Sequence, residues 1–277
     1  MQSLKPLEAG VMFWAGRDAL ADVCSAGVRC GQLGLPGGME LNGAAAAQRK
    51  QALDAAGFRV VTVFAAYEGE SYADIPTVQA TVGFIPRATR AEREARTLAV
   101  SDFAAVLGVK SIACHIGFVP EDAADPDYGA VREVVRRVCD HAAAHGQSFA
   151  LETGQERADV LLRFLADCGR DNLGINFDPA NLILYGTGEP IAALRTLAPH
   201  VLSVHAKDGD WPPRDEPGAL GSERALGQGA VGIDRFVGAL KELGFRGTLN
   251  VEREGAVPGE WLKDVGEAVR LLNSLTA

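Results

Sequence analysis

Short apolar runs alternate with longer segments of helical periodicity along the whole chain. Eight apolar runs have the length of one strand each, at residues 11–16, 28–35, 58–67, 109–117, 147–152, 173–178, 200–206 and 246–252. The segments between and after them predict helices near residue 17 and at about 42–56, 88–107, 131–142, 156–168, 188–198, 233–244 and 261–272. The pattern therefore predicts eight successive strand–helix units.

The helix expected over 131–142 illustrates the periodicity. Its apolar positions are Val131, Val134, Val135, Val138 and Ala142, which share one face of a helix. Several predicted helices also end at a glycine, the residue that most readily takes the left-handed position closing a helix. These glycines are Gly57, Gly108, Gly146, Gly169 and Gly244.

Eight β/α units in one chain of this length are typical of a (β/α)8 TIM barrel. We therefore expect an α/β protein made of a single barrel domain over residues 1–277. The alternative is an open, doubly wound sheet, which favours fewer strands and a glycine-rich first turn. No G-x-G-x-x-G motif follows a predicted strand here, and this favours the barrel.

Two connections are longer than turns, at residues 67–87 and 209–229. Both follow predicted strands, so both are expected on the face of the barrel where the strands end. Long loops at that face often act as lids over an active site. The alternative interpretation is that they are insertions without a role.

Composition and charge exclude several classes of partner. The 277-residue chain is 47% hydrophobic and carries a formal charge of −9, which disfavours a nucleic-acid partner. No stretch reaches the roughly 18 uncharged apolar residues of a membrane span, and the N-terminus lacks the pattern of a secretory leader. The five cysteines are scattered and form no C-x-x-C motif, which favours reduced thiols and a cytoplasmic protein.

The last four predicted strands each end in a polar side chain. These residues are Glu152, Asp178, His205 and Glu252. In a TIM barrel the ends of adjacent strands surround one mouth, so the four side chains are expected to meet. Three carboxylates and one imidazole suit Mn²⁺, Mg²⁺ or Co²⁺, with Zn²⁺ as a further candidate. The alternative is that each residue caps or salt-bridges its own strand.

Four motifs at these strand ends carry a resemblance to a known family. "LETGQE", "NFDPANL", "SVHAKD" and "NVERE", in this order, resemble the xylose isomerase-like TIM barrels. That family contains metal-dependent sugar isomerases and epimerases, and also dehydratases. The resemblance implies that Glu152, Asp178, His205 and Glu252 hold the metal, and that Glu152 and Glu252 transfer the proton.

The chemistry explains why two glutamates and a cation belong together. A cation bound to a carbonyl and a neighbouring hydroxyl acidifies the C–H between them. One carboxylate removes that proton and the other returns it, through an enediolate. We expect an isomerase or epimerase of a keto-sugar or related polyol, and a lyase or dehydratase of an inosose or cyclic keto acid is the alternative. A non-catalytic barrel would be expected to lack a ligand, and all four are present.

Two positions depart from the epimerase pattern. Asn181 stands where the epimerases carry a substrate-binding histidine, three residues after the aspartate. Trp211 stands where they carry an arginine, and the nearest arginine is Arg214. Asn181 and Arg214 are therefore candidates for substrate binding, and the substrate itself stays open.

Three further residues are candidates for substrate contacts by position. His115 ends the fourth strand, Lys207 lies two residues beyond His205 on the same strand face, and Trp14 ends the first strand. Lys207 is expected either to neutralise Glu152 or to contact a substrate oxygen. The alternatives are a core histidine, a salt bridge and a core tryptophan. The sequence leaves assembly into a homo-oligomer open.

The remaining histidines lie away from the predicted mouth. His141 and His145 form "HAAAH" on an outer helix, and His200 begins its strand. The i, i+4 spacing of His141 and His145 can bind a metal, but we interpret it as a solvated surface.

Overall fold

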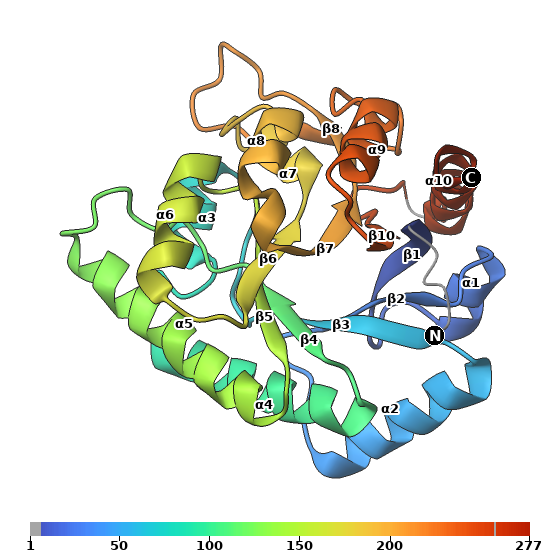
Figure 1. The fold of residues 1–277 in the computed structure, drawn as a ribbon, viewed down its shortest axis with the longest axis horizontal. Helices are drawn as coiled ribbons and strands as arrows, with labels where there is room; N and C mark the ends of the chain where they lie inside the picture. Colours follow the sequence, from blue (N-terminus) through green and yellow to red (C-terminus); the bar gives the residue numbers. More distant parts are fainter. Residues whose placement is uncertain (1–6, 258) are drawn as a thin grey trace.

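Eight parallel strands close into a barrel in the computed structural model of the chain, which describes residues 7–257 and 259–277 (Figure 1). The strands are β1 (Leu7–Trp14), β2 (Cys30–Leu35), β3 (Arg59–Ala65), β4 (Ser111–Cys114), β5 (Ser148–Glu152), β6 (Leu173–Phe177), β7 (Val201–Ala206) and β10 (Gly247–Val251). They follow the order β1-β10-β7-β6-β5-β4-β3-β2 around the barrel, and β2 pairs with β1. The predicted (β/α)8 barrel is confirmed, because an open sheet would leave two edges unpaired. The expectation about a leader concerns in part residues 1–6, which lie outside the described residues.

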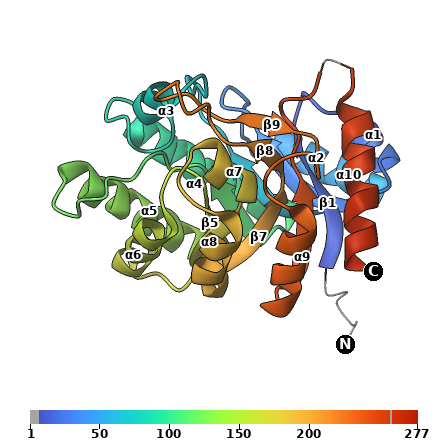
Figure 2. The ribbon, with the colours of Figure 1, turned by 90° about the horizontal axis from the view of Figure 1, so that it is seen from above.

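Helices surround the barrel and cover the outward face of its strands (Figure 2). They are α1 (Leu20–Ser25), α2 (Gly43–Ala56), α4 (Arg90–Leu107), α5 (Pro126–Ala144), α6 (Ala158–Cys168), α8 (Pro190–Leu197), α9 (Ile233–Glu242) and α10 (Trp261–Thr276), with a 3₁₀ turn η1 (Ala198–His200) after α8. The valine face of α5 is buried, as its periodicity predicts. Gly57, Gly108 and Gly169 close α2, α4 and α6 with φ of 61°, 76° and 57°.

Two short helices were not expected from the periodicity. Helix α3 (Ile75–Thr81) lies in the first long connection, and α7 (Pro179–Leu184) follows β6 directly. Both begin with an aspartate that caps the helix and carry a proline in the first turn. They are too short to show a full apolar stripe, so capping chemistry rather than periodicity marks them.

The second long connection contains a small antiparallel hairpin, formed by β8 (Asp208–Asp210) and β9 (Ser222–Arg224). The two long connections also touch each other, because the Ile75 amide donates to the Gly218 carbonyl at 2.9 Å. Neither connection is therefore a plain loop, although both lie beyond the strand ends as predicted.

The strand positions alternate between the outer core and the barrel interior. The interior holds a small apolar cluster of Met12, Phe64, Ala113 and Ala150, with Trp14 packed against it. Beside this cluster the interior is polar. Gln32 on β2 donates to Asn176 on β6 at 2.8 Å, although these strands stand on opposite sides of the barrel. Because side chains alternate along each strand, polar side chains such as these point into the barrel interior below the mouth.

The sequence predicts neither disulfide bonds nor membrane-spanning helices. All five cysteines are free thiols, so no disulfide joins them. Among the described residues, no helix is both long and apolar enough to cross a membrane.

Candidate metal and substrate site

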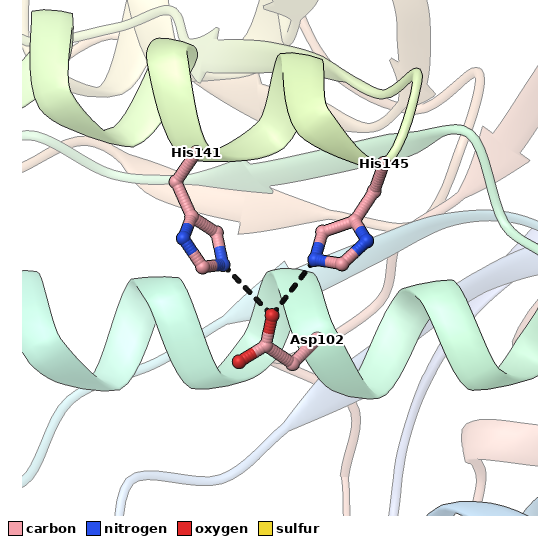
Figure 3. A group of neighbouring side chains, drawn as sticks. All are labelled: Asp102, His141 and His145. Atoms are coloured by element: carbon pink, nitrogen blue, oxygen red, sulfur yellow. Dashed lines mark hydrogen bonds and ion pairs between the residues drawn. The ribbon is translucent and has the colours of Figure 1, made fainter.

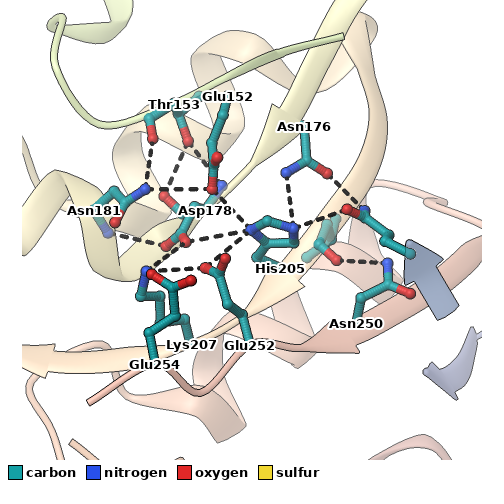
Figure 4. Close-up of polar contacts among 12 residues, drawn as sticks. Glu152, Thr153, Asn176, Asp178, Asn181, His205, Lys207, Asn250, Glu252 and Glu254 are labelled. Atoms are coloured by element: carbon teal, nitrogen blue, oxygen red, sulfur yellow. Dashed lines mark hydrogen bonds and ion pairs between the residues drawn. The ribbon is translucent and has the colours of Figure 1, made fainter. Parts of the chain in front are cut away.

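Glu152, Asp178, His205 and Glu252 meet at one point at the mouth of the barrel (Figure 4). Each offers a ligand atom, and these atoms all lie within 4.8 Å of one another. They come from β5, the end of β6, β7 and the end of β10, where parallel strands bring their carboxyl ends together. All four are buried, so their charges interact with little screening by water.

His205 points its Nδ1 atom at the three carboxylates. Nδ1 lies 2.8 Å from Glu152 Oε1, 3.2 Å from Glu252 Oε2 and 3.5 Å from Asp178 Oδ2. On the other side of the ring, Nε2 lies 2.9 Å from Gln32 Oε1. When a metal takes the place of the proton on Nδ1, an Nε2 proton donated to Gln32 would hold the ring in position, the arrangement usual for a metal-binding histidine.

Asp178 has one oxygen engaged and one without a donor. Its Oδ1 accepts the Asn181 amide at 2.9 Å, which caps α7. Its buried Oδ2 receives no hydrogen bond from the described residues. His205 Nδ1 lies 3.5 Å and Lys207 Nζ 3.8 Å from it. A buried carboxylate oxygen without a partner is costly, and a divalent cation would satisfy it. The four residues therefore fit a bound cation.

Each glutamate has its own cationic partner. Lys207 Nζ donates to Glu252 Oε2 at 2.9 Å, and His115 Nε2 lies 2.8 Å from Glu152 Oε2. The expectation that Lys207 neutralises Glu152 is therefore corrected, because Lys207, directly after β7, extends its side chain toward Glu252 at the end of the neighbouring β10. Glu152 is instead paired with His115.

Burial and charge act in opposite directions on these groups. Burial raises the pKa of Glu152, but the His115 and His205 rings outweigh it and hold the pKa at about 2. Burial also raises the pKa of Glu252, but His205 and Lys207 outweigh it and hold that pKa well below its ordinary value. Burial raises the pKa of Asp178 to about 6, against the lowering effect of Lys207. The two glutamates are therefore the carboxylates that stay ionised most readily.

A cavity of about 260 Å³ opens beside these residues. His115, Lys207, Asn181 and Trp14, four of the five predicted substrate contacts, line it. Gly34 makes the position of Trp14 available, because a Cβ there would meet the indole at 2.3 Å. Asn181 also reaches the site directly, with Nδ2 at 3.4 Å from Glu152 Oε1.

Arg214 is not brought to the cavity. It is exposed on the connection between β8 and β9 and is not among the residues that line the cavity. Trp211 is likewise exposed on this connection. The part of the hairpin that does line the cavity is Leu220, Gly221 and Glu223.

Several residues that line the cavity were not predicted. They are Glu70, Tyr72, Tyr185, Glu223 and Glu254, together with the apolar Leu184 and Leu220. Glu254 accepts the Trp14 indole N–H at 3.1 Å. The period-two spacing that brings Glu252 to the mouth also applies to Glu254, so the sequence could have predicted that Glu254 lies there. Tyr72 and Tyr185 could not be predicted in this way, because α3 and α7 position them.

Comparison with known sequences identifies the family of the chain. The profile of the family described as xylose isomerase-like TIM barrel matches residues 20–275. The chain belongs to this family. A solved xylose isomerase domain protein from Planctomyces limnophilus is 44% identical, covers 97% of each chain and superimposes with a TM-score of 0.92.

Three further proteins share less sequence identity with the chain. The uncharacterized protein YihM of Escherichia coli (strain K12) is 29% identical over 147 residues, which is 50% of this chain and 43% of that protein. The chain thus matches less than half the length of this curated relative. A D-allulose 3-epimerase from Methylomonas sp. in complex with D-allulose is 17% identical, with a TM-score of 0.70 and 98% and 97% coverage. A xylose isomerase-like barrel from Mycobacterium smegmatis in complex with magnesium is 20% identical, with a TM-score of 0.62 and 86% and 80% coverage. These last two show a shared fold.

Proposed function

We propose that this barrel is a divalent-cation-dependent isomerase or epimerase of a keto-sugar or related polyol. The observation that carries the proposal is the convergence of Glu152, Asp178, His205 and Glu252 around His205 Nδ1 at the barrel mouth. Membership of the xylose isomerase-like family supports it. All four residues come from one barrel, so we propose that the chain acts as a single domain.

The donor set favours the harder divalent ions. Three carboxylates and one imidazole suit Mn²⁺, Mg²⁺ or Co²⁺ better than Zn²⁺, which prefers more nitrogen or sulfur. Two distant relatives contribute to this proposal through what they bind, because one holds magnesium and the other D-allulose. A bound cation would polarise a substrate carbonyl and so acidify the adjacent C–H.

In the proposed mechanism the two glutamates move the proton. Glu152 on β5 and Glu252 after β10 approach the same point from strands that are separated by β6 and β7. They therefore face a bound substrate from different sides. One takes the proton from carbon and the other returns it at the same carbon or the neighbouring carbon.

Their partners prepare them for this exchange. Lys207 holds Glu252 in its ionised form, and the His115 ring does the same for Glu152. When a glutamate gains a proton, its cationic partner is free to bond a substrate oxygen instead. The apolar face of Trp14 forms a wall of the cavity, and Asn181 offers an amide to a hydroxyl.

A substrate panel followed by NMR in D₂O tests the proposal. Ketoses, inososes and oxidised glycosides are incubated with the protein and Mn²⁺, and the products are identified. Solvent deuterium at the carbon beside the carbonyl of an isomerised ketose is the expected result. Deuterium uptake with loss of water would instead indicate a dehydratase. No exchange with any keto compound at saturating Mn²⁺ would contradict the proposal.

A further inference from the structure

Three polar ties join the α4 region to the neighbouring helix α5. Two use arginine, with Asp127 bound by Arg87 and Arg90 at 3.0 and 2.7 Å, and Glu94 bound by Arg137 at 2.6 Å. The third contact lies at the other end of the α4–α5 interface, and there two imidazoles bind the carboxylate in place of a guanidinium. Its members are Asp102 on α4, His141 on α5 and His145 at the end of α5.

Both imidazoles point the same ring nitrogen at one carboxylate oxygen (Figure 3). His141 Nε2 lies 2.8 Å and His145 Nε2 lies 2.9 Å from Asp102 Oδ1. The two rings are 5.4 Å apart at 69°, as expected for residues one helical turn apart. Two histidines at i and i+4 on one helix face are an established zinc-binding spacing.

The geometry can accept a metal ion with small movements. A tetrahedral zinc ion with bonds of about 2.0–2.2 Å needs ligand atoms about 3.3 Å apart. The nitrogen–oxygen separations are about half an ångström shorter than that. The Asp102 side chain is 59% exposed and the histidines are 32% and 33% exposed, so they can move apart and an ion can enter from solvent.

The charges of the cluster also suit a cation. Partial burial raises the pKa of Asp102, but the hydrogen bonds from His141 and His145 outweigh it and lower the pKa, so the carboxylate is ionised at neutral pH. Lys110 donates to the His145 carbonyl at 2.9 Å and not to the Asp102 carboxylate. None of the three side chains lines the cavity at the barrel mouth.

We propose that Asp102, His141 and His145 form a second metal site, which takes a nitrogen-preferring divalent ion such as Zn²⁺ on the outer face of the barrel. Two imidazoles, one carboxylate and a water molecule complete a tetrahedral shell. The ion links α4 to α5 in the way that arginine does at the other two ties. Because it binds the folded chain, it raises the unfolding temperature. This site is independent of the function proposed for the mouth.

The five histidines of the chain make an NMR titration decisive. Their ring C–H signals are assigned by substitution, and Zn²⁺ is added in the presence of excess Mg²⁺. We expect the signals of His141 and His145 to shift together and to saturate near one equivalent of bound ion. The His200 signal is the internal control and stays in place. Any shift of His115 or His205 reports the mouth separately.

Calorimetric titration of variants tests the same site without spectroscopy. His145→Ala and Asp102→Asn should each weaken this zinc site at least tenfold, because losing even a partner that only orients a metal ligand costs about 10–100-fold. His200→Ala is the matched control and should bind Zn²⁺ like the native chain. His141→Gln, which keeps a bulky polar side chain on the helix, provides a second variant if His145→Ala unfolds. Unchanged zinc affinity and stoichiometry in folded His145→Ala and His141→Gln would overturn the proposal.

Discussion

Lys207 Nζ lies 2.9 Å from Glu252 Oε2, and both side chains are buried at the mouth of the barrel. A buried ammonium at this distance stabilises the ionised glutamate. Together with His205 it holds the pKa of Glu252 well below its ordinary value, against the raising effect of burial.

Replacing Lys207 by methionine should therefore raise the pKa of Glu252. A base must be ionised to accept a proton, so the acid limb of kcat/KM should move to higher pH. An opposite charge within about 4–6 Å lowers a carboxyl pKa by about 1–3 units, which sets the expected shift at one pH unit or more. Lys207→Arg keeps the charge and is the control. An acid limb at the same pH in both variants would contradict this role of Lys207.

Gln32 Oε1 lies 2.9 Å from His205 Nε2, so this amide orients a metal ligand from the opposite wall of the barrel. Gln32→Met keeps the volume but removes the acceptor, and His205 can then turn or change its protonated nitrogen. We expect affinity for Mn²⁺ to fall by about 10–100-fold, the usual effect of losing such a partner. Calorimetric titration with Mn²⁺ measures it, and Gln32→Glu, which keeps an acceptor, should retain more of the affinity. Equal affinity in Gln32→Met and the native chain would show that His205 is held by other contacts.

Glu223 fastens the β8–β9 hairpin to the segment that follows β10. Its carboxylate accepts from Arg253 Nη1 at 2.7 Å and from the Gly255 amide at 3.0 Å. Glu223→Ala removes these bonds, so amide hydrogen exchange over residues 209–229 should become faster while the barrel strands stay protected. Arg224→Ala, which breaks only an exposed pair with Asp210, is the matched control. Equal exchange in the two variants would show that Glu223 does not hold the hairpin.

Glu156 gives the protein a pH-dependent stability. Burial raises its pKa to about 7, although the Val119 amide donates to it at 2.8 Å. The unfolded chain has the ordinary value of 4.5, so the folded chain binds the extra proton between these two values. Stability from this group is therefore greatest at low pH and declines as the pH rises toward 7.

Glu156→Gln should abolish this decline because the amide does not titrate. Between about pH 5.5 and about pH 8 the native chain should lose about 2 kcal/mol more stability than the variant. Urea unfolding at the two pH values measures the difference, and Asp159→Asn, an exposed change nearby, is the control. A parallel pH dependence in native and Glu156→Gln chains would contradict the buried, protonated state of Glu156.

Much of this architecture could be predicted from the sequence, because the helix period of 3.6 residues and the strand period of two residues are visible without tertiary information. Alternation along β7, continued by one residue past its end, places His205 and Lys207 on one face. Parallel strands bring their ends to one mouth, so Glu152 and Glu252 could be expected nearby. The pairing of Lys207 with Glu252 rather than Glu152 could not be read in this way. It depends on which neighbouring strand the long lysine side chain crosses.

Other features of the site could not be predicted from the periodicity of the sequence, each for its own reason. Gln32 reaches His205 across the barrel, and that contact depends on the stagger between distant strands. Tyr72 is carried by the α3 connection, whose path no local pattern defines. Helix α7 did have a local signal, because Asp178 followed by Pro179 is a typical cap and first turn. Asp178 has both roles in the structure, because Oδ1 caps α7 and the side chain belongs to the candidate metal cluster.

The most direct test of the central claim compares Glu252→Gln and Glu152→Gln with His205→Ala at saturating Mn²⁺, once a substrate is known. Each glutamine keeps the size of the side chain and one ligand oxygen but cannot accept the proton. We expect kcat to drop by about 10²–10⁴-fold in both, with no recovery in excess metal. His205→Ala removes a ligand and no base, so excess Mn²⁺ should restore part of its activity. Near-normal kcat in either glutamine variant at saturating metal would contradict proton transfer by the two glutamates.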